Sequence, residues 1–213
     1  MTSLLHLPIS ARGEASVSRR IGQRALEAFR RAIPGLRIVG RDLGREPLPH
    51  PDPAFVAANL TAEAERGPAE RAALTLSERL IAELEAADLL LISTPMHNFT
   101  VPSALKAWID FVVRPGATFR SSPAGKVGLL ADRPVFVVAA CGGRFGTAPG
   151  AQQDFLGPYL TYLFATIGLT SVEILRLDAL GRGGTALERA EAAAAGWIAA
   201  QASTLPERFR KAG

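Results

Sequence analysis

The stretch Leu89-Leu-Leu-Ile-Ser-Thr-Pro-Met-His-Asn-Phe-Thr-Val-Pro-Ser-Ala-Leu-Lys-Ala-Trp-Ile-Asp110 joins a strand pattern to a helix pattern. Its opening apolar run carries no charge, as expected of a strand buried on both faces of a parallel sheet. Pro95 ends this pattern, and Pro102 suits the start of a helix, where a missing N–H costs least. Between the two prolines, Met96 and Phe99 place apolar side chains in a loop. An apolar loop directly after a buried strand predicts contact with a ligand.

Strand-like and helix-like segments alternate along the chain, which is typical of a parallel sheet with helices on both faces. The chain shows no internal repeat, low-complexity tract or linker, so residues 1–213 are predicted to form a single domain. Five strands with intervening helices predict an α/β, flavodoxin-like, doubly wound sheet in the order 2-1-3-4-5. The segment 114–130 is expected to be a long excursion interrupted by Gly, Pro and Ser, of a kind that is often functional in a compact domain. The predicted strands are 4–9, 36–42, 89–93, 134–140 and 171–177, and the predicted helices are 18–33, one from 54, 69–87, 102–112, 152–167 and 185 to about 208.

The composition limits the classes of function. A chain of 213 residues fits one large domain that buries roughly 70% of its unfolded surface. Its 24 Lys and Arg against 20 Asp and Glu leave a net charge of +4 without a basic stripe, so nucleic acid is not an expected partner. The single cysteine, Cys141, excludes an internal disulfide. With no apolar run long enough to span a bilayer and no leader pattern, we expect a cytoplasmic protein without a membrane anchor.

Ligands of a doubly wound sheet bind beyond the carboxyl ends of its strands. The first loop expected there, residues 10–18, carries hydroxyls at Ser10, Ser16 and Ser18 in front of a helix. Hydroxyls and free amides at a helix N-terminus suit a phosphate group, although Ser16 or Ser18 can equally act as an ordinary N-cap. The loop lacks both the Gly-Lys-Ser/Thr ending of a Walker loop and the GxGxxG pattern.

Two more loops are expected at the same edge, the second at residues 95–99 and the third at residues 140–143. Met96 and Phe99 offer an apolar face, and the Asn98 amide and backbone N–H groups offer hydrogen bonds to the edge of a planar ring. The adjacent glycines of the third loop allow backbone to approach such a ring, with a tight turn as their alternative role. The three loops together predict a site for flavin mononucleotide (FMN).

These motifs resemble those of the FMN-dependent NADH-azoreductases, a family also described as NADH:quinone reductases. The resemblance extends from about residue 3 to about residue 200 and rests on the three loops, the helix after the second loop and residues 116–120. It implies a homodimer with active sites at the interface and one FMN per subunit. The residues it implies for FMN are Ser10, Ser16, Val17, Ser18, Pro95, Met96, His97, Asn98, Phe99, Ala140, Cys141, Gly142 and Gly143.

The family resemblance implies a two-electron, ping-pong hydride transfer, in which NADH or NADPH reduces FMN and a quinone or azo compound then takes the electrons. Such chemistry needs no protein nucleophile, and the sequence shows no convincing acid/base pair. Two alternatives stay open. One is a non-enzymatic electron carrier of the flavodoxin type, although such carriers tend to be acidic and this chain is basic. The other is a different FMN reductase, of the chromate or nitro type, on the same fold.

Four positions depart from the family pattern. His97 and Ser121 stand where the family usually has tyrosine, and Ala140-Cys141 stands where it usually has Ser-Arg. Because these positions border the flavin or the substrate, we expect FMN binding to be kept and substrate preference to change.

Few other side chains are candidates for chemistry. His97 is the candidate catalytic acid, with a packing or hydrogen-bonding role as the alternative. Cys141 is interpreted as a small residue in a tight loop rather than a redox thiol. Phe119 and Phe145 are predicted to contact the substrate. No metal site is expected, because the ligand types are not grouped in the sequence.

Overall fold

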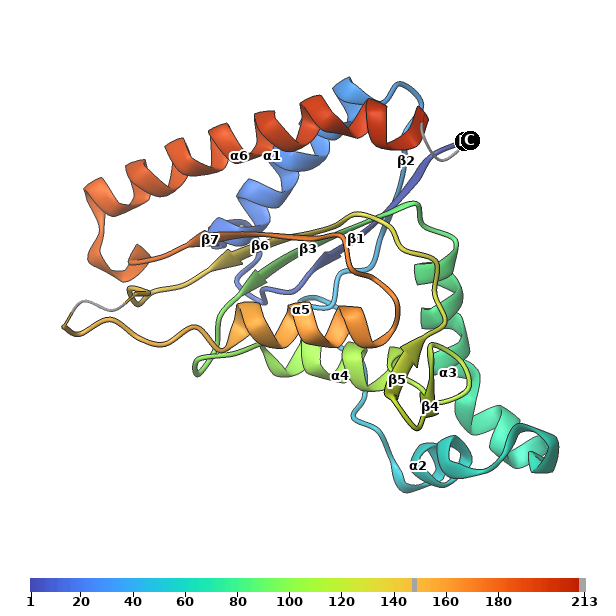
Figure 1. The fold of residues 1–213 in the computed structure, drawn as a ribbon. Helices are drawn as coiled ribbons and strands as arrows, with labels where there is room; N and C mark the ends of the chain where they lie inside the picture. Colours follow the sequence, from blue (N-terminus) through green and yellow to red (C-terminus); the bar gives the residue numbers. More distant parts are fainter. Residues whose placement is uncertain (147–148, 211–213) are drawn as a thin grey trace.

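The computed structural model describes residues 1–146 and 149–210. Its central strands are β1 (Ser3–Pro8), β2 (Arg37–Gly40), β3 (Leu89–Pro95), β6 (Val135–Ala140) and β7 (Val172–Leu177). Its α-helices are α1 (Val17–Ala32), α2 (Pro53–Leu60), α3 (Pro68–Glu85), α4 (Ser103–Val112), α5 (Leu156–Thr166) and α6 (Gly184–Arg210). The strands form a five-stranded parallel sheet in the order β2-β1-β3-β6-β7, with α1 and α6 on one face and α3, α4 and α5 on the other (Figure 1). The predicted flavodoxin-like α/β class is therefore confirmed.

A small antiparallel hairpin changes the numbering of the predicted strand order. Strands β4 (Phe119–Ser122) and β5 (Gly125–Gly128) pair only with each other, so the fourth and fifth strands of the parallel sheet are β6 and β7. The sequence predicted no strand within the excursion of residues 114–130, so these two strands were missed. They are short and rich in Ser, Gly and charged residues, so they lack the apolar alternation that marks a strand in sequence.

Helix α5 begins later than the sequence predicted. Residue 152 was assigned to the helix, but the backbone N–H of Gln152 donates to the Arg144 carbonyl at 2.8 Å, which keeps this residue in the preceding loop. The Asp154 carboxylate then accepts from the N–H of Gly157 at 2.9 Å and supplies an acceptor at the start of the helix. Within the described residues, no helix is long and apolar enough to cross a membrane.

The sheet has an apolar core on each face, because successive side chains of a strand point to opposite sides. Leu90 and Ile92 of β3 pack into the core under α3, α4 and α5, which includes the fully buried Trp108. Leu89 and Leu91 pack into the core under α1 and α6. The charge-free strand predicted from the sequence is thus buried on both faces.

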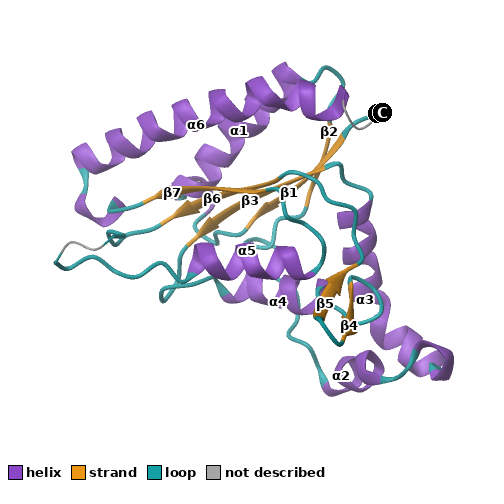
Figure 2. Cartoon of the chain, viewed as in Figure 1, coloured by secondary structure: helices purple, strands orange, loops and turns teal. Residues whose placement is uncertain are grey.

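The carboxyl ends of the central strands meet at one edge of the sheet. Pro8 of β1 is in register with Ser93 of β3, and Pro95 of β3 is in register with Ala140 of β6. Figure 2 shows the loops after β1, β3 and β6 leaving the sheet at this edge, toward the left of the view. The fold therefore brings the three predicted loops to the same side of the molecule.

Candidate functional site

The first loop ends at the N-terminus of α1. Ser16 is the N-cap, and its hydroxyl accepts from the backbone N–H of Arg19 at 3.4 Å. The Ser16 and Ser18 hydroxyl oxygens lie 3.1 Å apart, and both side chains are buried. The amides of Val17 and Ser18 belong to the first turn, where a helix provides no acceptor of its own. Ser16 is therefore an N-cap, and the turn it opens still has donors for an anion.

Ser10, at the other end of the first loop, is also buried. Its hydroxyl accepts from the backbone N–H of Arg12 at 3.3 Å, and its carbonyl accepts from the Arg19 side chain at 2.7 Å. The fold thus brings all three predicted serines to the region where β1 passes into α1. Arg19 was not among the residues singled out in the sequence.

The second loop is a tight turn with an unusual backbone. His97 and Thr100 exchange two backbone hydrogen bonds of 3.0 Å, while Asn98 and Phe99 between them have φ angles of 47° and 73°. Two positive φ angles are typical of a type I′ turn, which favours Asn and Gly and costs a residue such as Phe roughly 1–2 kcal/mol. Backbone strain of this kind concentrates at binding sites. Here it holds the Phe99 side chain outward, 56% exposed, and leaves the amides of both central residues outside the turn's own bonds.

The third loop is held from behind by the chain that follows β7. The carbonyls of Cys141, Gly142 and Gly143 accept from the amides of Leu180, Gly181 and Ala179 at 3.1, 3.1 and 2.6 Å, respectively. The space that a Cβ would fill at Gly142 is open, with no atom of the described chain within 4 Å. This loop therefore has a fixed backbone with free space beside a glycine, which suits the close approach of a flat ligand.

The second and third loops contact each other through a cluster of three side chains. The Gln152 amide nitrogen lies 2.9 Å from the Cys141 sulfur and 3.3 Å from the Met96 sulfur, and the two sulfurs are 3.6 Å apart. Gln152 also lies against Gly143, where an added Cβ would come within 2.6 Å of its side-chain oxygen. Gln152 was not predicted from the sequence as a site residue, because it was assigned to a helix and its partners are distant in the chain.

The two predicted substrate residues lie in different places. Phe145 follows the third loop, and its backbone N–H donates to the Asp178 carboxylate at 3.1 Å. Phe119 is buried in β4, with the Lys126 amine 4.7 Å from its ring centroid. Because the hairpin of β4 and β5 lies away from the three loops (Figure 2), Phe119 does not join them within one subunit.

Charged groups lie beside the first loop. His6 on β1 is buried, and its Nε2 atom is 2.9 Å from the Ser93 hydroxyl. Burial, assisted by the positive charge of Arg19 and partly offset by Asp42, lowers the pKa of His6 to about 4, so its imidazole is neutral near pH 7. The hydrogen bonds from Arg19 hold the pKa of the Asp42 carboxyl below its usual value. Among the residues the structure describes, no group of three metal-ligating side chains occurs.

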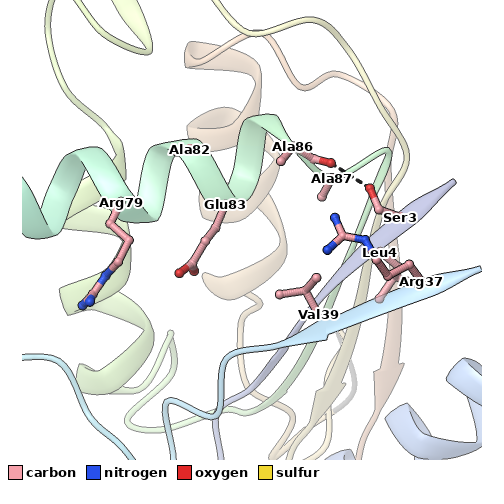
Figure 3. Close-up of a pocket in the computed structure, with 9 residues that line it drawn as sticks. All are labelled: Ser3, Leu4, Arg37, Val39, Arg79, Ala82, Glu83, Ala86 and Ala87. Atoms are coloured by element: carbon pink, nitrogen blue, oxygen red, sulfur yellow. Dashed lines mark hydrogen bonds between the residues drawn. The ribbon is translucent and has the colours of Figure 1, made fainter. Parts of the chain in front are cut away.

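A cavity of about 300 Å³ lies at the opposite edge of the sheet (Figure 3). It opens between the starts of β1 and β2 and the end of α3, and the Ser3 hydroxyl donates there to the Ala86 carbonyl at 2.7 Å. Its lining residues are Ser3, Leu4, Arg37, Val39, Arg79, Ala82, Glu83, Ala86 and Ala87. The one carboxylate among them, that of Glu83, is paired with Arg41. Because doubly wound sheets bind ligands at the carboxyl edge, the three loops rather than this cavity form the candidate site.

These features define a flavodoxin-like protein: a doubly wound parallel sheet, a helix N-terminus after β1 with donors suited to a phosphate, and two open loops after β3 and β6. In agreement, residues 2–201 match the family model for the flavodoxin-like fold. The chain is 57% identical over 183 residues to FMN-dependent NADH:quinone oxidoreductase 2 of Cupriavidus pinatubonensis, covering 86% of this chain and 89% of the relative. It is 42% identical over 208 residues to the FMN-dependent NADH:quinone oxidoreductase of Hyphomonas neptunium, covering 96% and 97%. The chain therefore belongs to the flavodoxin-like family and, within it, to the family of the FMN-dependent NADH:quinone oxidoreductases.

Solved structures are also similar. A crystal structure of the azoreductase AzrA has a TM-score of 0.85 at 25% identity and covers 95% of this chain and 100% of its own. An FMN-dependent NADH-azoreductase from Bacillus anthracis, crystallised in complex with FMN, has a TM-score of 0.83 at 23% identity, covering 96% and 99%. The second similarity supports the fold alone.

Proposed function

We propose that this protein is an FMN-dependent oxidoreductase that transfers two electrons from NADH to quinones and azo compounds. The observation that carries the proposal is the 57% identity, over 86% of the chain, to a protein named FMN-dependent NADH:quinone oxidoreductase 2. The three loops at the carboxyl edge of the sheet support it, because they provide the separate contacts that a phosphate and a flat ring require.

The residues present fit FMN. The N-terminus of α1, with the hydroxyls of Ser10, Ser16 and Ser18, would hold the phosphate through hydrogen bonds and the helix dipole. The turn at Asn98 and Phe99 would donate backbone hydrogen bonds to the edge of the ring, and the open space beside the third loop would receive its face. The chemistry that bound FMN supplies is acceptance of a hydride from NADH and delivery of two electrons to the acceptor. The residues proposed to contact it are Ser10, Ser16, Val17, Ser18, Pro95, Met96, His97, Asn98, Phe99, Ala140, Cys141, Gly142 and Gly143.

The work of the protein is then to orient substrates and to exclude water. His97 holds the turn through its backbone, and its side chain is exposed. We therefore propose that the His97 side chain lies on the side of the site where the acceptor binds. Histidine in place of the family's tyrosine would then affect substrate choice more than FMN binding. The exposed imidazole remains the candidate proton donor to the acceptor.

A homodimer would complete the site. Most of the large apolar side chains that are exposed belong to elements and loops that Figure 1 shows on the α4 and α5 side of the sheet or at its ends: α2, the second loop, the β4–β5 hairpin and the residue after it, and α5 with the residue before it. These residues are Val56, Leu60, Phe99, Val127, Leu129, Phe155 and Tyr162. An exposed apolar surface of this kind is typical of a protein interface. We place the dimer contact on this side, where the β4–β5 hairpin that carries Phe119 can reach the three loops of a second subunit.

The visible spectrum of the purified protein and its NADH consumption test the proposal. We expect flavin absorption bands, present at purification or gained with added FMN, and NADH oxidation that depends on an added quinone without a partner reductase. A flavodoxin-type carrier would show the bands but would not oxidise NADH alone. Activity with chromate or nitro compounds but with no quinone or azo dye would favour the other FMN reductases. A protein that binds no FMN would overturn the proposal.

A further inference from the structure

Arg19 on α1 contacts both ends of the first loop. Its side-chain Nε donates to the Ser10 carbonyl at 2.7 Å, and its backbone N–H donates to the Ser16 hydroxyl at 3.4 Å. The two terminal nitrogens of the same guanidinium donate to the Asp42 carboxylate at 2.7 and 2.5 Å. One side chain thus connects the loop after β1 to the loop after β2.

Asp42 connects these hydrogen bonds to the backbone beyond β2. Its Oδ1 atom also accepts from the amides of Gly44 and Arg45, at 3.1 and 3.0 Å. Gly44 in turn packs directly on the first loop, where an added Cβ would lie only 2.4 Å from the Ser10 carbonyl oxygen. Its own amide donates to the Pro8 carbonyl at 3.2 Å. The segment 42–45 therefore forms a rigid support behind Ser10.

The pair between Arg19 and Asp42 is partly shielded from water. The side chains are 13% and 25% exposed, and both ends are held in a two-point geometry that a guanidinium and a carboxylate match well. Three of the five guanidinium donors are engaged, and the carboxylate balances the charge. Direct attraction for a phosphate is therefore not the main contribution of Arg19.

We propose that Arg19 and Asp42 are positioning residues that hold the first loop in the shape that binds the FMN phosphate. This inference rests on the proposed function. By fixing the Ser10 carbonyl and the Ser16 hydroxyl relative to the start of α1, the pair orients the serine hydroxyls before the ligand arrives. A preformed site loses less conformational freedom on binding than a flexible loop does.

Comparison of FMN with riboflavin, which has the same ring but no phosphate, tests this role. We expect Arg19→Ala to weaken FMN binding about tenfold, because a charge-assisted hydrogen bond to the loop is lost. Riboflavin affinity is expected to change less than about twofold, since the ring contacts belong to the other two loops. Dissociation constants are measured by quenching of flavin fluorescence. Asp42→Asn, which keeps the size of the side chain, is the second variant and is expected to act in the same direction.

Arg41→Ala is the matched control. Arg41 and Glu83 form another two-point pair, with side chains 21% and 23% exposed, but neither residue contacts the first loop. We expect this variant to lose comparable stability while the ratio of FMN to riboflavin affinity stays that of the wild type. Equal losses for both ligands in the Arg19 and Asp42 variants, or no loss for either, would overturn the positioning role and leave the proposed function intact. A wild-type protein that binds neither ligand would overturn both.

Discussion

At the residue scale, Phe99 and His6 show how the tertiary structure gives ordinary residues special states. Phe99 has a left-handed backbone that its own sterics disfavour, and the paired His97 and Thr100 on either side impose it. His6 is a potential cation that burial keeps neutral. Neither state is visible in sequence, because each depends on atoms that the folded chain brings to the residue.

The neutral state of His6 makes stability depend on pH. An unfolded histidine titrates near pH 6.5, whereas folding lowers the pKa of His6 to about 4. Between these values the unfolded chain binds more protons, so the free energy of unfolding decreases as the pH falls through this window, by roughly 3 kcal/mol in all. We expect His6→Gln to show a smaller decrease than the wild type in urea unfolding between about pH 6.5 and pH 4. Identical pH slopes in the two proteins would contradict this assignment.

At the scale of elements, α1 packs on the sheet with almost no space between them. A Cβ added at Gly22 of α1 would lie 1.9 Å from the Ser93 hydroxyl oxygen and 2.9 Å from the Ser93 Cβ atom. The same hydroxyl is hydrogen-bonded to His6, so it is not free to move aside. This close contact fixes the height of α1 above β3 and thereby places the N-terminus of the helix beside the carboxyl edge.

Two glycines inside helices are expected to respond to alanine with opposite signs. Gly22→Ala would force α1 away from β3 and should lower the free energy of unfolding by about 1–3 kcal/mol. Gly196 of α6 is exposed and has no atom within 4 Å of the position of an added Cβ. Gly196→Ala should therefore raise the free energy of unfolding by about 0.5–1 kcal/mol through helix propensity. Urea unfolding of both variants measures the effects, and a shift of both in one direction would be inconsistent with this packing.

At the scale of the whole molecule, the two faces of the sheet differ in what they expose. The side covered by α1 and α6 has one large exposed apolar residue on its described helices, Leu187. The other side has exposed apolar residues on α2, on α5, in the hairpin and in the second loop. This asymmetry supports the side chosen for the proposed dimer contact.

Charged substitutions on the two faces are expected to affect the oligomeric state differently. Leu60 on α2 and Tyr162 on α5 are 78% and 77% exposed, so their replacement by glutamate costs the isolated subunit little. We expect the double variant Leu60→Glu, Tyr162→Glu to shift the proposed dimer to monomer in sedimentation experiments. Leu187→Glu, on the opposite side, should leave the dimer intact. A wild-type monomer, or dimers that persist in the double variant, would argue against an interface on this side.

Much of the architecture could be predicted because its signals are local. The charge-free run before Pro95, the four-residue spacing of Ile21, Ala25 and Phe29, and the prolines and glycines between segments depend only on neighbours in the chain. These signals predicted five parallel strands, covering helices and three loops at one edge. They failed for β4 and β5, whose residues lack a strand pattern, and for the start of α5, which a contact with Arg144 delays.

The sequence by itself therefore determined the class of fold and the loops that form the candidate site. Only the tertiary structure revealed the strained turn at Phe99, the support of the first loop by Arg19 and Asp42, and the contact of Gln152 with Met96 and Cys141. The physical reason is the range of the interactions. Periodicity and turn propensity act between neighbours in the chain, whereas these contacts join segments that are adjacent only after the strands have paired and the helices have packed on them.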